Sequence, residues 1–135
     1  MLEARGLDVL YGDYQILWDA HFRADAREVV AILGPNGAGK STLMNTLSGL
    51  VRARNGEITC KSQPIASMPP HRIVGLGLVH VLERRRLFPY LTVRENLILG
   101  AYNRSARPHR EQSLADVEAL FPFLRTRAGQ LAHTL

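Results

Sequence analysis

Apolar and polar residues alternate at short spacing in two segments at the start of the chain, Leu2–Val9 and Ile16–Phe22. Such alternation is typical of strands with one buried face. Gly12-Asp13 lies between the segments and favours a tight turn, so we expect an antiparallel pair. The next apolar run, Glu28–Leu33, is uninterrupted and rich in β-branched residues. It predicts a central parallel strand that is buried on both faces.

Helical periodicity begins directly after this run. Leu43, Met44, Leu47 and Leu50 recur at the spacing of one helix face, which predicts a helix over Lys40–Leu50 with Gly49 close to its end. Further along, the pattern predicts a turn at 54–56, a strand at Glu57–Lys61, a short helix from Pro69 to Val74, and a strand at Leu76–Leu82.

The last third of the chain is predicted to be helical. Thr92 and Glu95 have the spacing of a capping box, which predicts a helix that begins after Thr92 and reaches about Tyr102. Polar residues at 105–110 predict a loop, and an amphipathic helix at Glu111–Leu120 follows. Neither a repeat nor an interdomain linker interrupts the pattern, so we interpret residues 1–135 as part of one domain.

Composition narrows the class of protein. The 135 residues are 46% hydrophobic, which suffices for one core, and no apolar run approaches the ~20 residues of a membrane span. The start of the chain lacks a signal-peptide layout, so we expect a cytoplasmic location. The single Cys60 is interpreted as a strand residue. The charge of +5 is spread over the chain without a basic stripe, which argues against a nucleic-acid partner.

The strongest chemical signal is the segment Gly34-Pro35-Asn36-Gly37-Ala38-Gly39-Lys40-Ser41-Thr42. It meets the full phosphate-binding pattern G-x-x-x-x-G-K-[S/T], and it lies between a predicted buried strand and a predicted helix. Glycines at such positions let backbone N–H groups turn toward a phosphate at the positive end of the helix. We therefore expect a P-loop that binds a nucleotide, most simply ATP.

Three residues of this loop have predicted contacts of their own. Lys40 is expected to reach the β- and γ-phosphates, and the Ser41 hydroxyl to ligate the Mg²⁺ that bridges them. Thr42 is placed to contact the α-phosphate. A glycine-rich turn with an incidental lysine is the alternative, and the flanking strand and helix argue against it.

The amino-acid sequence of the loop resembles that of the ATP-binding cassette (ABC) transporter ATPases, and the resemblance covers almost the whole chain. Tyr11, in Leu10-Tyr11-Gly12, matches the aromatic residue that stacks on adenine in this family. Glu83 stands at the position of the Q-loop glutamine, where a carboxylate can join the Mg²⁺ network. The segments Leu87–Pro89 and Leu91–Leu97 continue the match.

The segments 69–74, 87–89 and 96–102 are most similar to the branched-chain amino acid importers, in which Glu also occurs at the Q-loop position. An importer of urea or another small amide is the nearest alternative. Leu82, Arg84 and Arg27 depart from the family at positions where Pro or Gly serves a special backbone geometry. The run Arg84–Arg86 is interpreted as a solvated face, with contact to acidic loops of a partner as the alternative.

The resemblance implies an α/β P-loop NTPase core of the ABC ATPase type, with an N-terminal antiparallel β subdomain. It implies ATP and Mg²⁺ as ligands, a second ATPase subunit, identical or paralogous, and membrane permease subunits that hold the protein at the inner face of the membrane. A solute-binding protein would act indirectly. The family's signature loop, Walker B strand and switch histidine are not found in the sequence, which resembles the family up to the residues before the signature.

We therefore expect the chain to bind ATP without appreciable turnover, because no residue is expected to orient the attacking water. Loss of the flanking strands is also expected to expose Val29–Leu33 as an apolar edge. A non-hydrolysing nucleotide-binding fragment is the competing hypothesis to an importer ATPase. A different P-loop enzyme, such as a kinase, is disfavoured because it has no need of the 87–97 segment.

Overall fold

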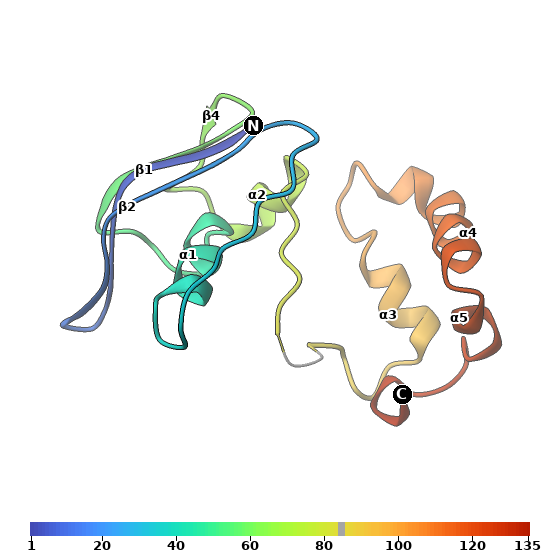
Figure 1. Cartoon of the computed structure of the whole chain (residues 1–135). Coiled ribbons are helices and arrows are strands. Elements are labelled where there is room, and N and C mark those ends of the chain that lie inside the picture. Colours follow the sequence, from blue (N-terminus) through green and yellow to red (C-terminus); the bar gives the residue numbers. More distant parts are fainter. Residues whose placement is uncertain (84–85) are drawn as a thin grey trace. The chain divides into compact units, whose positions relative to one another are not determined.

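The computed structural model describes residues 1–83 and 86–135, in two compact units, Met1–His80 and Val81–Leu135 (Figure 1). The departure noted at Arg84, and most of the arginine run, lie outside the described residues. Each unit is described by itself below. None of the helices in the described ranges has both the length and the apolar composition that crossing a bilayer requires.

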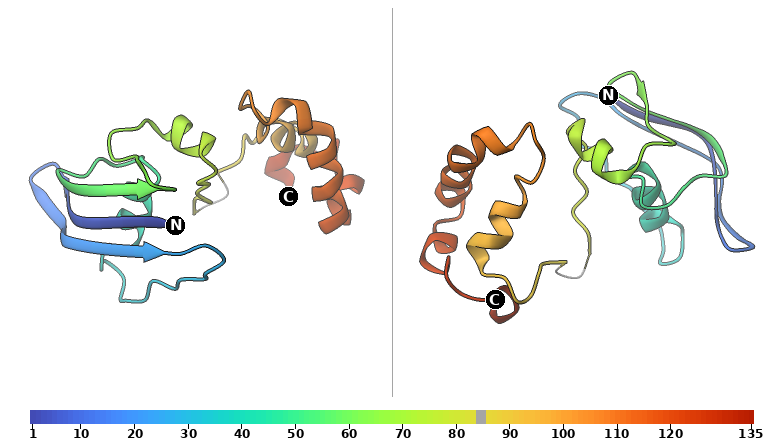
Figure 2. Two further views of the ribbon diagram at one scale, coloured as in Figure 1. Left: turned by 90° about the horizontal axis from the view of Figure 1, so that it is seen from above. Right: turned by 180° about the vertical axis from the view of Figure 1, so that it is seen from behind.

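The first unit is built on an antiparallel sheet with the strand order β2-β1-β3-β4 (Figure 2). Its strands are β1 (Leu2–Tyr11), β2 (Tyr14–Ala24), β3 (Asn55–Cys60) and β4 (Gln63–Pro64). The predicted pair around Gly12-Asp13 is confirmed, since Tyr11 pairs with Tyr14 across the turn. The predicted turn at 54–56 is not separate from the strand, because β3 already begins at Asn55, which pairs with Asp8 of β1.

One face of this sheet packs on the helices α1 (Lys40–Leu47) and α2 (Pro70–Gly75). Alternation brings Leu7 and Val9 of β1 to this face, and a register shift between Ala4 and Leu7 brings Ala4 to it as well. Burial of each large aliphatic side chain contributes roughly 1.5–3 kcal/mol. The core consists of Ala4, Leu7, Val9, Leu17, Leu43, Leu47, Ile58, Cys60, Ile65 and Ile73. Cys60 is therefore a buried strand residue, as predicted.

Helix α1 ends three residues before the predicted boundary. Ser48 is its C-terminal cap, and Gly49 follows with a φ of 77°, a left-handed conformation that favours glycine. A side chain at Gly49 would also place its Cβ 2.7 Å from Ile73 Cδ1. The close approach of α2 to the end of α1 therefore depends on this glycine.

Two predicted strands are absent from the described residues. Residues 28–33 and 76–82 belong to no strand, and Val29 and Leu33 are 97% and 89% exposed. Both segments are rich in apolar residues, but a strand needs hydrogen-bonded neighbours. None of the four strands pairs with either segment. Apolar composition alone therefore does not make a strand where no partner strand lies beside it.

The second unit is helical. Its elements are α3 (Val93–Leu99), η1 (Arg107–His109), α4 (Arg110–Leu120), α5 (Pro122–Thr126) and η2 (Ala132–Thr134). The predicted capping box is confirmed: the Thr92 Oγ1 accepts from Glu95 N at 3.2 Å, and Glu95 Oε2 accepts from Thr92 N at 2.7 Å. These hydrogen bonds from the Thr92 backbone and side chain lower the pKa of Glu95. The predicted loop at 105–110 contains the short η1 helix.

A loop at 88–92 leads into α3 and is fixed from two sides. Asn96 accepts from Phe88 N at 2.9 Å and donates to Phe88 O at 3.1 Å, so one side chain closes the loop. The chain near its C-terminus holds the other side, since Ala132 N donates to Leu91 O and His133 N donates to Pro89 O. This pairing between distant segments gave no signal in the apolar pattern.

Asp8 connects three parts of the sheet. Its carboxylate accepts from Asn55 Nδ2 at 3.0 Å, from Asp19 N at 3.0 Å and from Gln15 Nε2 at 3.1 Å. The hydrogen bond from Asn55, followed by that from the Asp19 backbone, lowers the pKa of Asp8 below its ordinary value. The ionised form of Asp8 is thus the form that fits the folded sheet.

Asp8→Asn is expected to lower stability at neutral pH, with the deficit shrinking in acid. A carboxyl whose folded pKa is depressed stabilises the fold above the unfolded pKa, and this contribution is lost as pH falls from about 4 through the folded value. Denaturant unfolding at several pH values measures it. Asp13→Asn is the control, because Asp13 has no hydrogen bond or ion pair with the described residues. Equal pH dependence of both variants would contradict the role of Asp8.

Candidate functional site

The predicted phosphate loop lies directly before α1 and has the conformation that its glycines permit. Gly34, Gly37 and Gly39 have φ values of 153°, 86° and 86°, which side-chain-bearing residues rarely adopt. Residues 34–38 are exposed, whereas Gly39 is buried. The loop thus presents its backbone to solvent and is attached to the core at its last glycine.

Gly39 is attached to the sheet through β2. A Cβ at Gly39 would lie 2.6 Å from Leu17 Cδ2 and 3.5 Å from Ile16 Cγ2. Leu17 is itself buried and pairs with Val9 of the neighbouring strand β1. Close packing of the Gly39 backbone on Leu17 therefore sets the position of the loop relative to the sheet.

The N-terminus of α1 favours the binding of an anion. Gly39 is its N-terminal cap without a side-chain hydrogen bond, and its first turn contains no acidic residue. Unpaired N–H groups at a helix start carry about half a positive charge, and no carboxylate of this turn competes for them. Because the loop before the helix is exposed, a phosphate can reach these N–H groups from solvent.

Lys40 is held over the loop. Its Nζ donates to Gly34 O at 2.7 Å and to Pro35 O at 2.8 Å, so the ammonium bridges the start of the loop to the start of the helix. Ser41 and Thr42 follow in the first turn of α1. The structure thus brings together residues 34–42 in one loop and helix start, the arrangement that the sequence predicts for phosphate groups.

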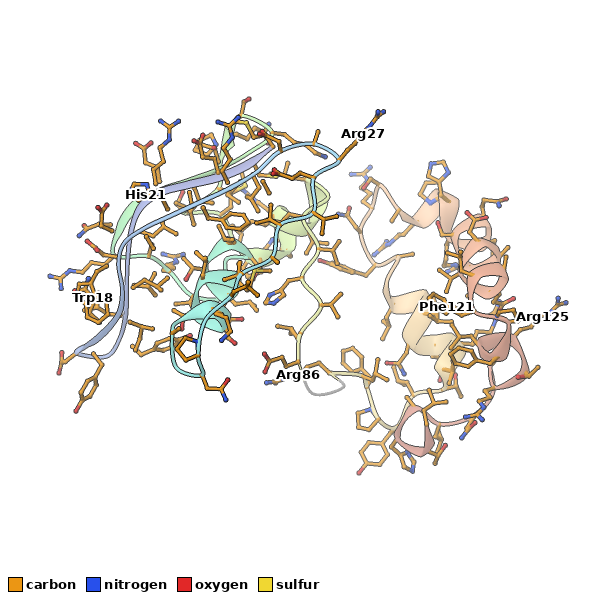
Figure 3. The ribbon with its side chains drawn as sticks, viewed as in Figure 1. Trp18, His21, Arg27, Arg86, Phe121 and Arg125 are labelled. Atoms are coloured by element: carbon orange, nitrogen blue, oxygen red, sulfur yellow. The ribbon has the colours of Figure 1, made fainter. Side chains whose placement is uncertain are left out.

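Tyr11 is the last residue of β1, at the turn of the β1–β2 hairpin. Its side chain is 47% exposed, which leaves ring surface for stacking. Tyr14 pairs with it and is 80% exposed, and Trp18 of β2 is exposed on the outside of the sheet (Figure 3). Sequence reasoning did not single out Tyr14, although a two-residue turn places it opposite Tyr11.

Glu83 belongs to the second unit, and its use with Ser41 as a Mg²⁺ ligand stays a prediction. Among the described residues, no group of three His, Cys, Asp or Glu side chains could hold a metal ion. A P-loop needs no such group, since phosphate oxygens, water and a hydroxyl supply most ligands of Mg²⁺. Arg27, one of the departures from the family, has a φ of 62° and an exposed side chain (Figure 3). An arginine thus occupies a left-handed turn position that favours glycine.

Comparison with known proteins gives a consistent result. Residues 17–134 match the family model for ABC transporters. The chain is 33% identical to a probable branched-chain amino acid transport ATP-binding protein, LivF, of Archaeoglobus fulgidus over 135 residues. It is 36% identical to the high-affinity branched-chain amino acid transport ATP-binding protein BraG of Pseudomonas aeruginosa. Both alignments include all of this chain, which spans 57% and 58% of the length of these relatives.

Solved structures show the same fold. A nucleotide-free ATP-binding cassette of an ABC transporter aligns with all of the chain and 58% of its own length, with a TM-score of 0.83 and 23% identity. An ATP-binding subunit of an ABC transporter aligns with 97% of the chain and 54% of its own length, with a TM-score of 0.79 and 28% identity. The fold class expected from the sequence is thereby confirmed.

Gly39→Ala is expected to destabilise the first unit more than Gly37→Ala does. Both glycines have a φ of 86°, so each alanine bears a left-handed penalty of roughly 1–2 kcal/mol. Only the Cβ at position 39 also meets Leu17, since nothing lies within 4 Å of a Cβ at position 37. Denaturant unfolding compares the two variants. Equal losses of stability would contradict the attachment of the loop through Leu17.

Proposed function

The chain belongs to the ABC transporter family, and from that premise we propose that it binds Mg²⁺-ATP as part of the ATP-binding subunit of a branched-chain amino acid importer. The observation that carries the proposal is the loop 34–42, with its left-handed glycines and the bridging Lys40. Similarity to LivF and BraG over the whole chain supports the choice of substrate class.

Each loop residue has a proposed role at the nucleotide. The backbone of Gly34–Gly39, including Pro35, Asn36 and Ala38, surrounds the β-phosphate, and Lys40 contacts the β- and γ-phosphates. Ser41 and Glu83 ligate Mg²⁺, and Thr42 contacts the α-phosphate. Tyr11 stacks on the adenine. For this role the Lys40 ammonium exchanges its present partners, the carbonyl oxygens of Gly34 and Pro35, for phosphate oxygens.

We propose that the importer subunit works at the inner face of the membrane, paired with a second ATPase subunit and with permease subunits. A solute-binding protein delivers the solute to the permease and makes no direct contact. The loop 87–90 supports a permease contact: Leu87, Phe88 and Tyr90 are 49%, 60% and 83% exposed, while two hydrogen bonds join the Asn96 side chain to the Phe88 backbone. Exposed aromatic residues on a fixed loop are typical of protein interfaces. An importer of urea or a related amide remains the alternative substrate class.

Lys40→Ala is expected to weaken ATP binding at least roughly tenfold, because hydrogen bonds to charged groups contribute about 1.5–3 kcal/mol each. Titration of the purified chain with a fluorescent ATP analogue measures the affinity. Lys61→Ala is the matched control, since Lys61 is the other lysine of the sequence and donates to Leu76 O. Equal affinity of the Lys40→Ala and unmodified chains would refute the proposed site.

The 135-residue chain is expected to bind ATP with no appreciable steady-state hydrolysis. In-line attack needs a group that orients the water and charge stabilisation from a facing subunit, and the resemblance assigns no residue of this sequence to either task. Phosphate release over hours, with the Lys40→Ala chain as a blank, measures turnover. Steady hydrolysis that disappears in the Lys40→Ala chain would show that these residues suffice for catalysis.

A further inference from the structure

The segment Leu78–Leu82, which leads from the first unit toward Glu83, has little to hold it in place. It forms no helix or strand, and Val79 and Val81 are 70% and 89% exposed. Leu78 packs against the core. The segment's single hydrogen bond with described residues joins His80 Nδ1 to Ser48 Oγ at 2.9 Å. One polar contact thus fixes the course of the chain as it leaves the first unit.

Ser48 is a rigid partner for this contact. It caps the C-terminus of α1, its backbone N–H donates to Met44 O at 3.1 Å, and the residue is only 8% exposed. Its hydroxyl also lies 3.1 Å from Asn45 O, so it can donate there while accepting from His80 Nδ1. The same helix begins at Lys40 in the phosphate loop. His80 is therefore tied to the element that carries the nucleotide site.

We propose that His80 is a positioning residue, which holds the chain entering the Q-loop against the end of α1 through its hydrogen bond to Ser48. The inference rests on the proposed function, because it matters for binding only if Glu83 ligates Mg²⁺. Glu83 follows His80 by three residues, a chain span of at most about 11 Å. Loss of the tether releases the chain at His80 from the end of α1, so the Mg²⁺-dependent part of ATP affinity falls while Mg²⁺-free binding by the P-loop does not.

The variants separate the hydrogen bond from packing. His80→Leu puts an apolar side chain of moderate size in place of the imidazole and so removes the polar atom. His80→Asn keeps a polar atom close to the position of Nδ1 and can donate or accept. Ser48→Ala removes the partner and leaves His80 in place, which gives a second disruption if His80→Leu fails to fold. Circular dichroism establishes that each variant used is folded.

Limited trypsin digestion tests the tether without nucleotide. The three arginines at 84–86, which follow the segment after Glu83, are trypsin cleavage sites. His80→Leu and Ser48→Ala are expected to speed cleavage at these sites about fivefold relative to cleavage after Arg5, as loss of one hydrogen bond implies. His80→Asn should cleave at the rate of the unmodified chain. Unchanged cleavage in both disrupting variants would overturn the proposal.

ATP titration with Mg²⁺ and with EDTA then tests positioning. His80→Leu is expected to weaken Mg²⁺-ATP binding severalfold and to leave Mg²⁺-free ATP binding unchanged. His80→Asn is expected to bind Mg²⁺-ATP with the affinity of the unmodified chain. Equal losses in both conditions would show a merely structural role and would overturn the proposal. If the unmodified chain binds no ATP, the proposed function fails, while the trypsin experiment still decides whether the tether exists.

Discussion

The contact of the Gly39 backbone with Leu17 is the constraint on which the candidate site depends. Leu17, in the edge strand β2, is buried and pairs with Val9 of β1, and a Cβ at Gly39 would lie 2.6 Å from its Cδ2. Glycine accommodates the left-handed conformation at this position, and any larger residue would require Leu17 Cδ2 to shift. The exposed loop before it can therefore present N–H groups and Lys40 to a phosphate from a fixed base.

The second unit shows how polar side chains can order a region with a small apolar core. Its buried apolar residues in the described range are Val93 and Ala132. Asn96 closes the loop before α3, and backbone hydrogen bonds join residues 89–94 to 128–133. Burial of apolar area contributes less here than in the first unit. Loss of the Asn96 side chain would therefore affect the fold of the loop strongly.

The segments 28–33 and 76–82 show the limit of apolar periodicity as a predictor. Their composition is that of central strands, yet neither segment is part of a strand in the described residues, and Leu76 and Gly77 form a turn after α2. Strand formation is non-local, because each strand obtains its hydrogen bonds from another part of the chain. Helix α1 and the capping box at Thr92 obtain theirs within a few residues, and these predictions were confirmed.

The sequence by itself determined the phosphate loop, the β1–β2 hairpin, the cap of α3 and membership of the family. Each of these depends on residues that are neighbours in the chain, or on a motif whose order carries its chemistry. Only the tertiary structure revealed the attachment of Gly39 to Leu17, the three-way bonding of Asp8 and the Ser48–His80 contact. These contacts join residues that lie far apart in sequence, and a contact between distant residues leaves no periodic signal along a single chain.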